Sequence, residues 1–224
     1  MCGRYALHNH PTIIALQFWL KEYSQEIKPR YNIAPGTQVL AVLEEAGLPR
    51  SAEMLKWGLV PFWAKDPKIG YKMSNARAET VDEKPAYRSA FKARRCILPA
   101  SGFYEWKSTG ARKQPYFICP SGKGLFGFAG LYEHWKGGND EIHSCAIITT
   151  EANSLMRTIH DRMPVILHEE DYARWLDPGN QNVSEMRALL KPFDSGLMRA
   201  YPVSTRVNNA RNDGAELLEP VESS

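Results

Sequence analysis

The sequence predicts an α+β fold: a single domain built on a curved, mostly antiparallel, barrel-like β-sheet with peripheral helices. Two observations lead to this prediction. Between residues 95 and 150, strand-like runs follow one another and are separated by turns rich in Gly, Ser and Asn, as expected for an antiparallel sheet. The 224 residues are enough to bury a real core, and no repeat, low-complexity tract or linker divides them. One domain over residues 1–224 is therefore expected.

The first part of the chain mixes helices with strands. Apolar spacing after the proline at position 11 predicts a helix over Pro11–Tyr23. The segment Arg30–Thr37 is rich in turn residues and is not expected to form a regular element, although loops of this kind often carry function. Gln38–Leu43 and Ala52–Val60 are predicted to be paired strands joined by a turn at residues 46–49.

The rest of the chain is predicted to contain two short helices, a run of strands and a mixed C-terminal part. The expected helices are Ser74–Thr80, Lys84–Ala93, Asn153–Thr158, Glu169–Leu176 and Val183–Leu190, and the expected strands are Arg95–Pro99, Gly102–Lys107, Pro115–Cys119, Leu125–Trp135, His143–Thr150 and Met198–Val203. Residues 219–224 are polar and are expected to be a frayed tail.

Composition excludes several classes of protein. The net charge of +3 does not by itself predict a nucleic-acid partner, although residues 1–100 hold 15 Lys and Arg against 9 Asp and Glu. The four cysteines include no CxxC pair, and His134, His143 and Cys145 match no zinc spacing, so neither a metal nor a cofactor is expected. The sequence contains no signal peptide and no apolar run of about 20 residues, which predicts a cytoplasmic protein. In a bacterium we expect it to be associated with the nucleoid. We also expect it to be a monomer.

The most informative stretch is the N-terminus, Met-Cys-Gly-Arg-Tyr. If Met1 is removed, Cys2 carries both a free α-amine, with a pKa of about 7.7–8.0, and a thiol, with a pKa of about 8.5. Such a 1,2-aminothiol converts an aldehyde first to an imine and then to a five-membered thiazolidine, or attacks an acyl carbon with the amine as internal base. If Met1 is retained, the amine is blocked. The alternative is that cysteine at this position has no chemical role.

Four other side chains are candidates for the same chemistry. Asn75 could hold the cysteine or its amine, and Arg77 could bind a phosphate, unless they are a helix cap and a surface arginine. Glu105 alternates with large aromatics along a predicted strand, and a carboxyl in such surroundings has a raised pKa, as a general acid needs. The alternative is a glutamate on an exposed sheet face. His160 could move protons at neutral pH or be structural.

These residues lie in motifs whose order resembles the SOS-response-associated peptidase (SRAP) family, whose members process abasic sites in DNA. The motifs begin at Cys2, Arg30, Trp57, Asn75, Gly102, Ile159 and Gly214 and read CGRY, RYNIAPGT, WGLVP, NARAET, GFYEWK, IHDRMP and GAEL. The resemblance runs from residue 2 to about residue 218. Residues 108–113, 136–142 and 176–196 are less similar to the family.

The resemblance implies a role for each candidate. Cys2 becomes linked to the abasic site once Met1 is removed, Asn75 positions it, Glu105 is the acid and base, and His160 assists imine formation. Arg4, Arg77 and Arg162 are implied as phosphate ligands, with Trp63 and Trp106 in contact with a base or the sugar. The implied partner is single-stranded DNA that contains an abasic site, which needs no base flipping.

Three other functions remain open from the sequence. N-terminal-nucleophile amidotransferases also begin Met-Cys-Gly, but they need an oxyanion hole and a domain that uses the ammonia. A thiol peptidase is the second, most simply one that removes its own Met1. The third is a non-catalytic module that binds single strands through its arginines and tryptophans.

Overall fold

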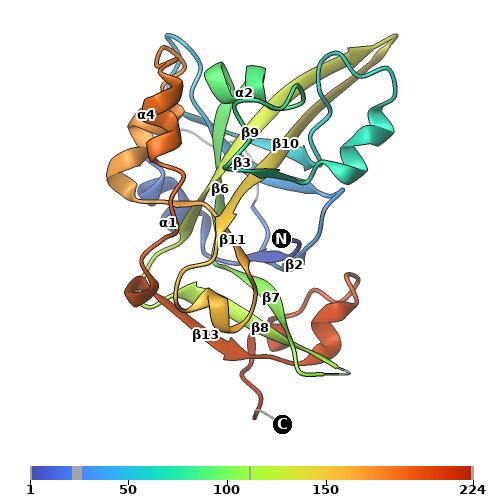
Figure 1. Cartoon of the computed structure of the whole chain (residues 1–224), viewed down its shortest axis with the longest axis vertical. Coiled ribbons are helices and arrows are strands. Elements are labelled where there is room, and N and C mark those ends of the chain that lie inside the picture. Colours follow the sequence, from blue (N-terminus) through green and yellow to red (C-terminus); the bar gives the residue numbers. More distant parts are fainter. Residues whose placement is uncertain (1, 22–26, 111, 223–224) are drawn as a thin grey trace.

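A computed structural model describes residues 2–21, 27–110 and 112–222. Its centre is a closed ring of five strands, in which each strand is hydrogen-bonded to the next and the last pairs with the first (Figure 1). The strands, in order around the ring, are β10 (Asp140–Glu151), β4 (Ser51–Trp57), β3 (Gln38–Leu43), β6 (Arg95–Ala100) and β9 (Phe126–Gly137). The predicted barrel-like sheet is therefore confirmed.

Three short strands extend the barrel from its long strands. β5 (Asn75–Arg77) and β11 (Arg162–Pro164) both pair with β10, and β12 (Ile166–Leu167) pairs with β9. The β10–β4 and β10–β5 pairs are parallel, and the other described pairs are antiparallel. Because β5 and β11 both pair with the end of β10, the Asn75 motif and the segment that follows His160 lie close together.

A second sheet lies below the barrel in Figure 1 and places the N-terminus beside the barrel. Its strands are, in order, β13 (Met198–Pro202), β8 (Lys113–Pro120), β7 (Gly102–Ser108), β1 (Tyr5–Leu7) and β2 (Arg30–Ile33). β7 lies between two hydrophobic clusters: Phe103 belongs to the main core, whereas Tyr104 and Trp106 belong to a smaller cluster with Val207 and Leu217. The predicted alternation of β7 is confirmed.

The helices are short and peripheral. The α-helices are α1 (Pro11–Gln17), α2 (Arg88–Ala93), α3 (Tyr172–Leu176) and α4 (Val183–Ala188), and the 3-10 helices are η1 (Pro67–Lys72), η2 (Met156–Thr158), η3 (Glu169–Asp171), η4 (Ser195–Leu197), η5 (Thr205–Asn208) and η6 (Ala215–Leu218). Within the part of the chain that the structure describes, no helix is long and apolar enough to cross a bilayer.

Two predicted elements are wrong in type. Arg30–Thr37 is not a loop throughout, because β2 pairs with β1 through Tyr5 and Ile33, and the turn is confined to residues 34–37, where Gly36 has a φ of 88°. Ser74–Thr80 is not a helix, because residues 75–77 form β5 against β10. Tertiary pairing here outweighs the local helix propensity of the alanine-containing segment.

Other predicted elements differ in their ends. The first helix stops at Gln17, and Trp19 has a left-handed φ of 53°; Tyr23 lies outside the described residues. The helix expected over Lys84–Ala93 begins at Arg88, after a series of turns. β4 ends at Trp57, where Gly58 has a φ of 143° and packs against the backbone of Gly70. The tail is not frayed at residues 220–221, because Pro220 bridges Val203 and the N–H of Val221 donates to Pro202.

Candidate active site around Cys2

Cys2 precedes β1 and is fully buried. Its carbonyl oxygen accepts a hydrogen bond of 2.9 Å from the side-chain amide of Asn75. The Oδ1 atom of Asn75 is also buried and has no hydrogen-bond partner among the described residues. The parallel pairing of β5 with β10 holds Asn75 in this position, so a side chain 73 residues away in sequence contacts the cysteine.

The environment of Cys2 affects its thiol and so decides which of its two nucleophiles, thiol or α-amine, is the stronger. Burial, and then the negative charge of Glu105, raise the pKa of the Cys2 thiol far above its ordinary value. The buried thiol is therefore harder to ionise than its ordinary pKa of about 8.5 indicates. A thiol in this environment keeps its proton at neutral pH, so the α-amine, when free, is the stronger nucleophile of the pair.

Glu105 lies on β7, which pairs with β1 through Tyr5 and Phe103. Its side chain is on the side of the strand that faces the main core and is 3% exposed, so the alternative of an exposed glutamate is wrong. Burial raises the pKa of Glu105, and nearby positive charge, including that of His160, opposes this rise. The carboxyl is thus close enough to both Cys2 and His160 for their charges to interact, and its predicted raised pKa is confirmed.

His160 lies in the turn between η2 and β11. Its Nδ1 atom accepts a hydrogen bond of 3.0 Å from the backbone N–H of Arg162, which assigns the proton of the neutral ring to Nε2. The same Nδ1 atom is 2.9 Å from a carboxylate oxygen of Asp161. The two contacts belong to different states of the ring, because Nδ1 accepts from Arg162 only when it carries no proton and donates to Asp161 only when it carries one.

Arg4 and Trp106 are held by the C-terminal part of the chain. The Nη1 atom of Arg4 donates to Asn32 Oδ1 and to the carbonyl of Val207, both at 2.7 Å. The guanidinium carbon lies 5.9 Å from the Trp106 ring centroid, and the Trp106 indole donates to Asn208 at 2.7 Å. Sequence reasoning missed Asn32, whose signal was its place in the motif that begins at Arg30.

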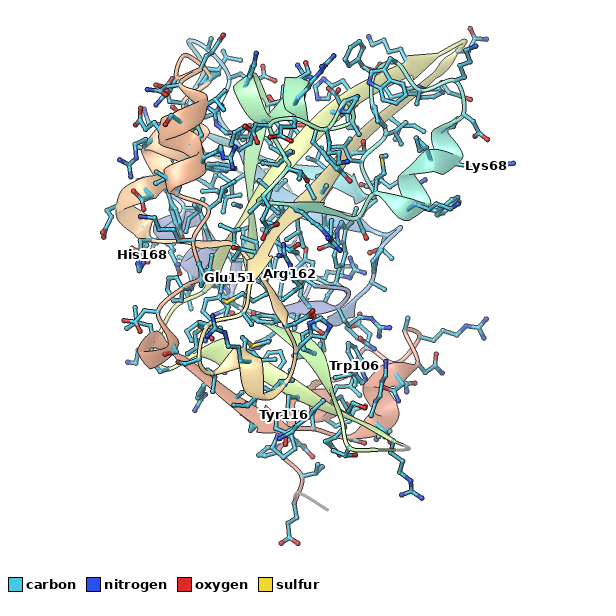
Figure 2. All side chains as sticks on the ribbon, in the orientation of Figure 1. Lys68, Trp106, Tyr116, Glu151, Arg162 and His168 are labelled. Carbon is cyan, nitrogen blue, oxygen red and sulfur yellow. The ribbon has the colours of Figure 1, made fainter. Side chains whose placement is uncertain are left out.

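Arg162 and Arg77 differ in how they are held. Arg162 forms a two-pronged ion pair with Glu79, at 2.5 and 2.9 Å, and donates to the Thr149 carbonyl at 2.7 Å. Arg77 is exposed. Sequence reasoning assigned no role to Glu79, although it lies in the NARAET motif two residues after Arg77. Figure 2 shows Arg162 near the middle of the molecule and Trp106 lower down, toward the C-terminal segment.

Trp63 lies apart from these groups. Its side chain is 49% exposed and donates a long hydrogen bond of 3.4 Å to the carbonyl of Pro85. Together with Phe62, Arg88 and Lys92 it lines a surface hollow. The structure therefore links Cys2, Asn75, Glu105, His160 and the arginine contacts more closely than it links any of them to Trp63.

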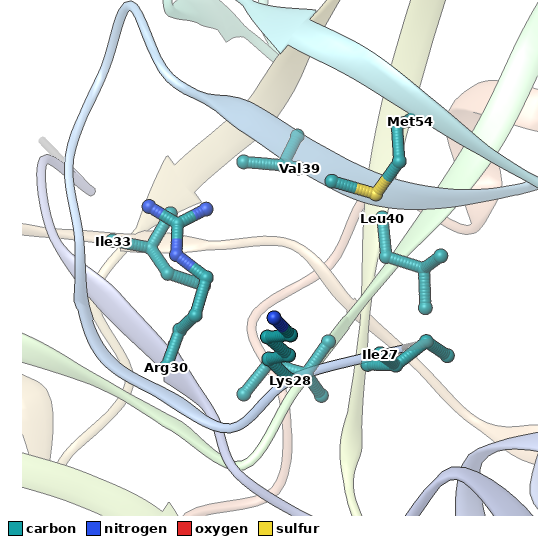
Figure 3. A pocket seen from close by; sticks show the side chains of 8 residues that line it. Ile27, Lys28, Arg30, Ile33, Val39, Leu40 and Met54 are labelled. Atoms are coloured by element: carbon teal, nitrogen blue, oxygen red, sulfur yellow. The ribbon is translucent and has the colours of Figure 1, made fainter. Parts of the chain in front are cut away.

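Other hollows and clusters do not match the predicted site. A largely apolar pocket of about 200 Å³ lies beside β2, β3 and β4, and its lining in Figure 3 includes none of the nine predicted site residues. Across the described ranges, no three His, Cys, Asp or Glu side chains are arranged to hold a metal ion. His134 and His143 stack with ring centroids 4.0 Å apart.

Comparison with known proteins gives the family. The model of the SOS response associated peptidase (SRAP) family matches residues 1–210. The abasic site processing protein YoaM of Bacillus subtilis is 46% identical over 223 residues, which are 98% of each chain. The abasic site processing protein HMCES of Xenopus tropicalis is 32% identical over 234 residues, covering 91% of this chain and 69% of that protein. A crystal structure from Bacteroides thetaiotaomicron has a TM-score of 0.88 at 27% identity, covering 99% of this chain and 100% of the other. The resemblance carried by the motifs is confirmed, and the chain belongs to the SRAP family.

Proposed function

We propose that this protein captures abasic sites in single-stranded DNA by forming a covalent thiazolidine between Cys2 and the ring-opened deoxyribose. The observation that carries the proposal is the surroundings of Cys2: the Asn75 amide donates to its carbonyl, and the buried Glu105 carboxyl is close enough for its charge to act on Cys2 and to interact with that of His160. The names of the relatives, abasic site processing proteins, agree with this substrate.

The reaction begins with the sugar, which is mostly a closed hemiacetal. A protonated Glu105 donates its proton to the ring oxygen while a water molecule accepts the proton of the C1′ hydroxyl, and the C1′–O4′ bond breaks to give the aldehyde, whose oxygen accepts a hydrogen bond from the Nε2–H of His160. Burial raises the pKa of Glu105, so at any given pH more of this carboxyl is protonated than in an exposed glutamate. The proton from the C1′ hydroxyl passes through water back to the Glu105 carboxylate, so Glu105 acts first as acid and then as base and is protonated again for the next step.

The Cys2 amine then attacks C1′ and gives a carbinolamine. This step requires that Met1 has been removed by hydrolysis of its peptide bond, which the protein itself is proposed to catalyse. Asn75 holds the cysteine carbonyl, and its unpaired Oδ1 is a suitable acceptor for the amine. Protonation of the hydroxyl by Glu105 releases water and leaves an imine.

Ring closure completes the adduct. The thiol sulfur bonds to C1′, the thiol proton passes to the nitrogen, and the product is a thiazolidine with one water lost overall. An imine alone would act as an electron sink for β-elimination and strand cleavage, and ring closure removes that sink. The closed ring shields the strand, and the same acid and base permit slow reversal.

The arginines and tryptophans are proposed to bind the strand. Arg4, Arg77 and Arg162 would contact phosphates, and Trp63 and Trp106 a base or the sugar. An arginine has five N–H donors, so Arg4 and Arg162 retain donors beyond their contacts within the protein. Backbone contacts of this kind predict binding by a monomer with strong salt dependence and little sequence preference.

The test is the formation of a covalent adduct. The protein, with its N-terminus checked by mass spectrometry, is mixed with a single strand that contains one abasic site and is then denatured. We expect a stable adduct with wild type and none with Cys2→Ala. Cys2→Ser keeps the amine but cannot form the thiazolidine, so its imine should be trapped only by borohydride.

The same experiment separates the other functions. A non-catalytic module would bind the strand and give no adduct. An amidotransferase or a thiol peptidase acting on other chains would give no adduct and would release ammonia from glutamine or cleave a peptide. Failure of the trimmed wild-type protein to form the adduct would overturn the proposal.

A further inference from the structure

The ion pair between Glu79 and Arg162 joins the two segments that hold the reactive groups. Glu79 follows β5, which supplies Asn75 and Arg77, and Arg162 begins β11, directly after the His160 turn. The guanidinium also donates to the Thr149 carbonyl, which accepts the N–H of Ala78 at 2.8 Å. The pair therefore clamps both segments to the end of β10.

The clamp reaches His160 through the backbone. The N–H of Arg162 donates to His160 Nδ1, so the position of the Arg162 main chain favours a proton on Nε2 over a proton on Nδ1 directed at Asp161. Anchoring the Arg162 side chain to Glu79 and Thr149 restrains that main chain. Without this anchor the Arg162 N–H would hold Nδ1 less firmly, and the Asp161 carboxylate, which approaches the same atom, would compete by favouring a proton on Nδ1.

The pair is expected to contribute little to the free energy of folding. The Glu79 side chain is 49% exposed and that of Arg162 is 18% exposed, and exposed pairs contribute little to folding. Its carboxylate also neutralises an arginine that a DNA phosphate would otherwise bind, so it does not favour DNA affinity in the free protein. The geometry is better suited to orientation than to stability or binding.

We infer that Glu79 is a positioning residue for the proposed crosslinking reaction: by holding Arg162 it fixes the His160 ring relative to Asn75 and Cys2. The expected effect on the crosslinking rate rests on the proposed function. The expected effect on the tautomer of His160 does not depend on it. Glu79 accelerates the reaction at bound DNA without tightening DNA binding.

The kinetic test compares Glu79→Gln with Asp82→Asn. Asp82 lies three residues later in the same turn and pairs with Arg187 of α4 at 3.0 Å, so its variant is a matched loss of one carboxylate. At saturating abasic strand, Glu79→Gln should crosslink about tenfold more slowly, because small misplacements of catalytic groups are costly. Asp82→Asn should stay within about twofold, and Glu79→Asp should recover part of the rate.

The binding test uses a strand with a tetrahydrofuran site, which has no aldehyde and cannot react. Glu79→Gln should bind this strand as tightly as wild type or up to about threefold more tightly, because Arg162 is released for a phosphate. Its Tm should change by less than about 4 °C. Equal losses of rate and affinity, or an unchanged rate at saturation, would overturn the inference.

The structural test is independent of any reaction. The ¹⁵N chemical shifts of the His160 ring should show protonated Nε2 in the neutral wild-type protein and a mixture of tautomers in Glu79→Gln. If wild type forms no adduct but the tautomer changes, the proposed function fails and the positioning role stands. If the tautomer is the same in both proteins, the positioning role fails whatever the reaction.

Discussion

Two sides of the Cys2 site each hold an arginine, but by different means. On one side Arg162 pairs with the half-exposed carboxylate of Glu79. On the other, Arg4 donates to the amide oxygen of Asn32 and to the carbonyl of Val207, which are both uncharged. The first arginine is paired with a carboxylate, whereas the second has no carboxylate partner within the part of the chain that the structure describes.

The partners of Arg4 are also more deeply packed. Asn32 is 3% exposed, and its Nδ2 donates to the carbonyls of Val207, Asn209 and Asn212 at 3.2, 3.1 and 2.7 Å. Partial burial lowers the pKa of Arg4, yet an arginine in this environment remains charged at neutral pH. The Arg4 side is thus a rigid source of positive potential, and the Arg162 side is an exchangeable ion pair.

The largest expected effect is at Glu105, whose charge interacts with Cys2 and with His160. Glu105→Gln removes the general acid and should lower the crosslinking rate at saturation by about 10²–10³-fold, with little change in affinity. A single-turnover rate and a binding isotherm on an unreactive abasic analogue measure the two quantities. A variant that reacts at the wild-type rate would remove Glu105 from the mechanism.

The same variant has a pH signature in stability. Because burial raises the pKa of Glu105, the folded protein binds this proton more tightly than the unfolded chain does. The stabilisation from the proton is present below the ordinary pKa of about 4.3 and is lost as the pH rises through the raised value. The Tm of Glu105→Gln minus the Tm of wild type should therefore be more positive at pH 8 than at pH 5.

Sequence could predict the chemistry of the centre better than its supports. Cys2, Asn75, Glu105 and His160 are residue types that the proposed reaction needs, and the alternation of β7 places Glu105 on the same face as Phe103, although the sequence left open whether that face is buried. Asn32 and Glu79 act through other side chains, and their partners are 175 and 83 residues away, so spacing could not reveal them. The wrong helix at residues 74–80 has the same origin, because only pairing with β10 makes that segment a strand.

Asn32→Ala should have the largest effect on stability. It removes one hydrogen bond from each of three carbonyls and one from Arg4, although the bond between Arg4 and the Val207 carbonyl remains, and unsatisfied buried groups cost about 1–3 kcal/mol each before relaxation. We expect a net loss of about 3 kcal/mol and a fall in Tm of about 6–12 °C. Asn208→Ala removes only the exposed contact to Trp106 and should change Tm far less, whereas equal shifts would contradict the rigid-side interpretation.

Arg77→Ala tests the arginine that neither side holds. Arg77 is exposed, so its loss should leave Tm unchanged while weakening binding of the abasic analogue three- to tenfold, a factor of about ten being 1.4 kcal/mol. The slope of log affinity against log salt should shrink by about 0.7 for a single strand. The exposed Lys191 provides the control: Lys191→Ala removes the same charge, and an equal loss of affinity would indicate a diffuse effect of net charge.

The smallest expected effect is a difference in how salt changes the coupling energy of each arginine with its partner. A double-mutant cycle of Glu79→Gln with Arg162→Gln should give a coupling in unfolding free energy of about 0.5–1 kcal/mol at low salt. At 1 M salt, where the Debye length is about 3 Å, this coupling should fall toward zero. The cycle of Asn32→Ala with Arg4→Gln should keep its value, because a buried contact with a neutral amide is screened little. If both couplings fell equally with salt, the two arginines would be held in the same way and the contrast between the sides would be lost.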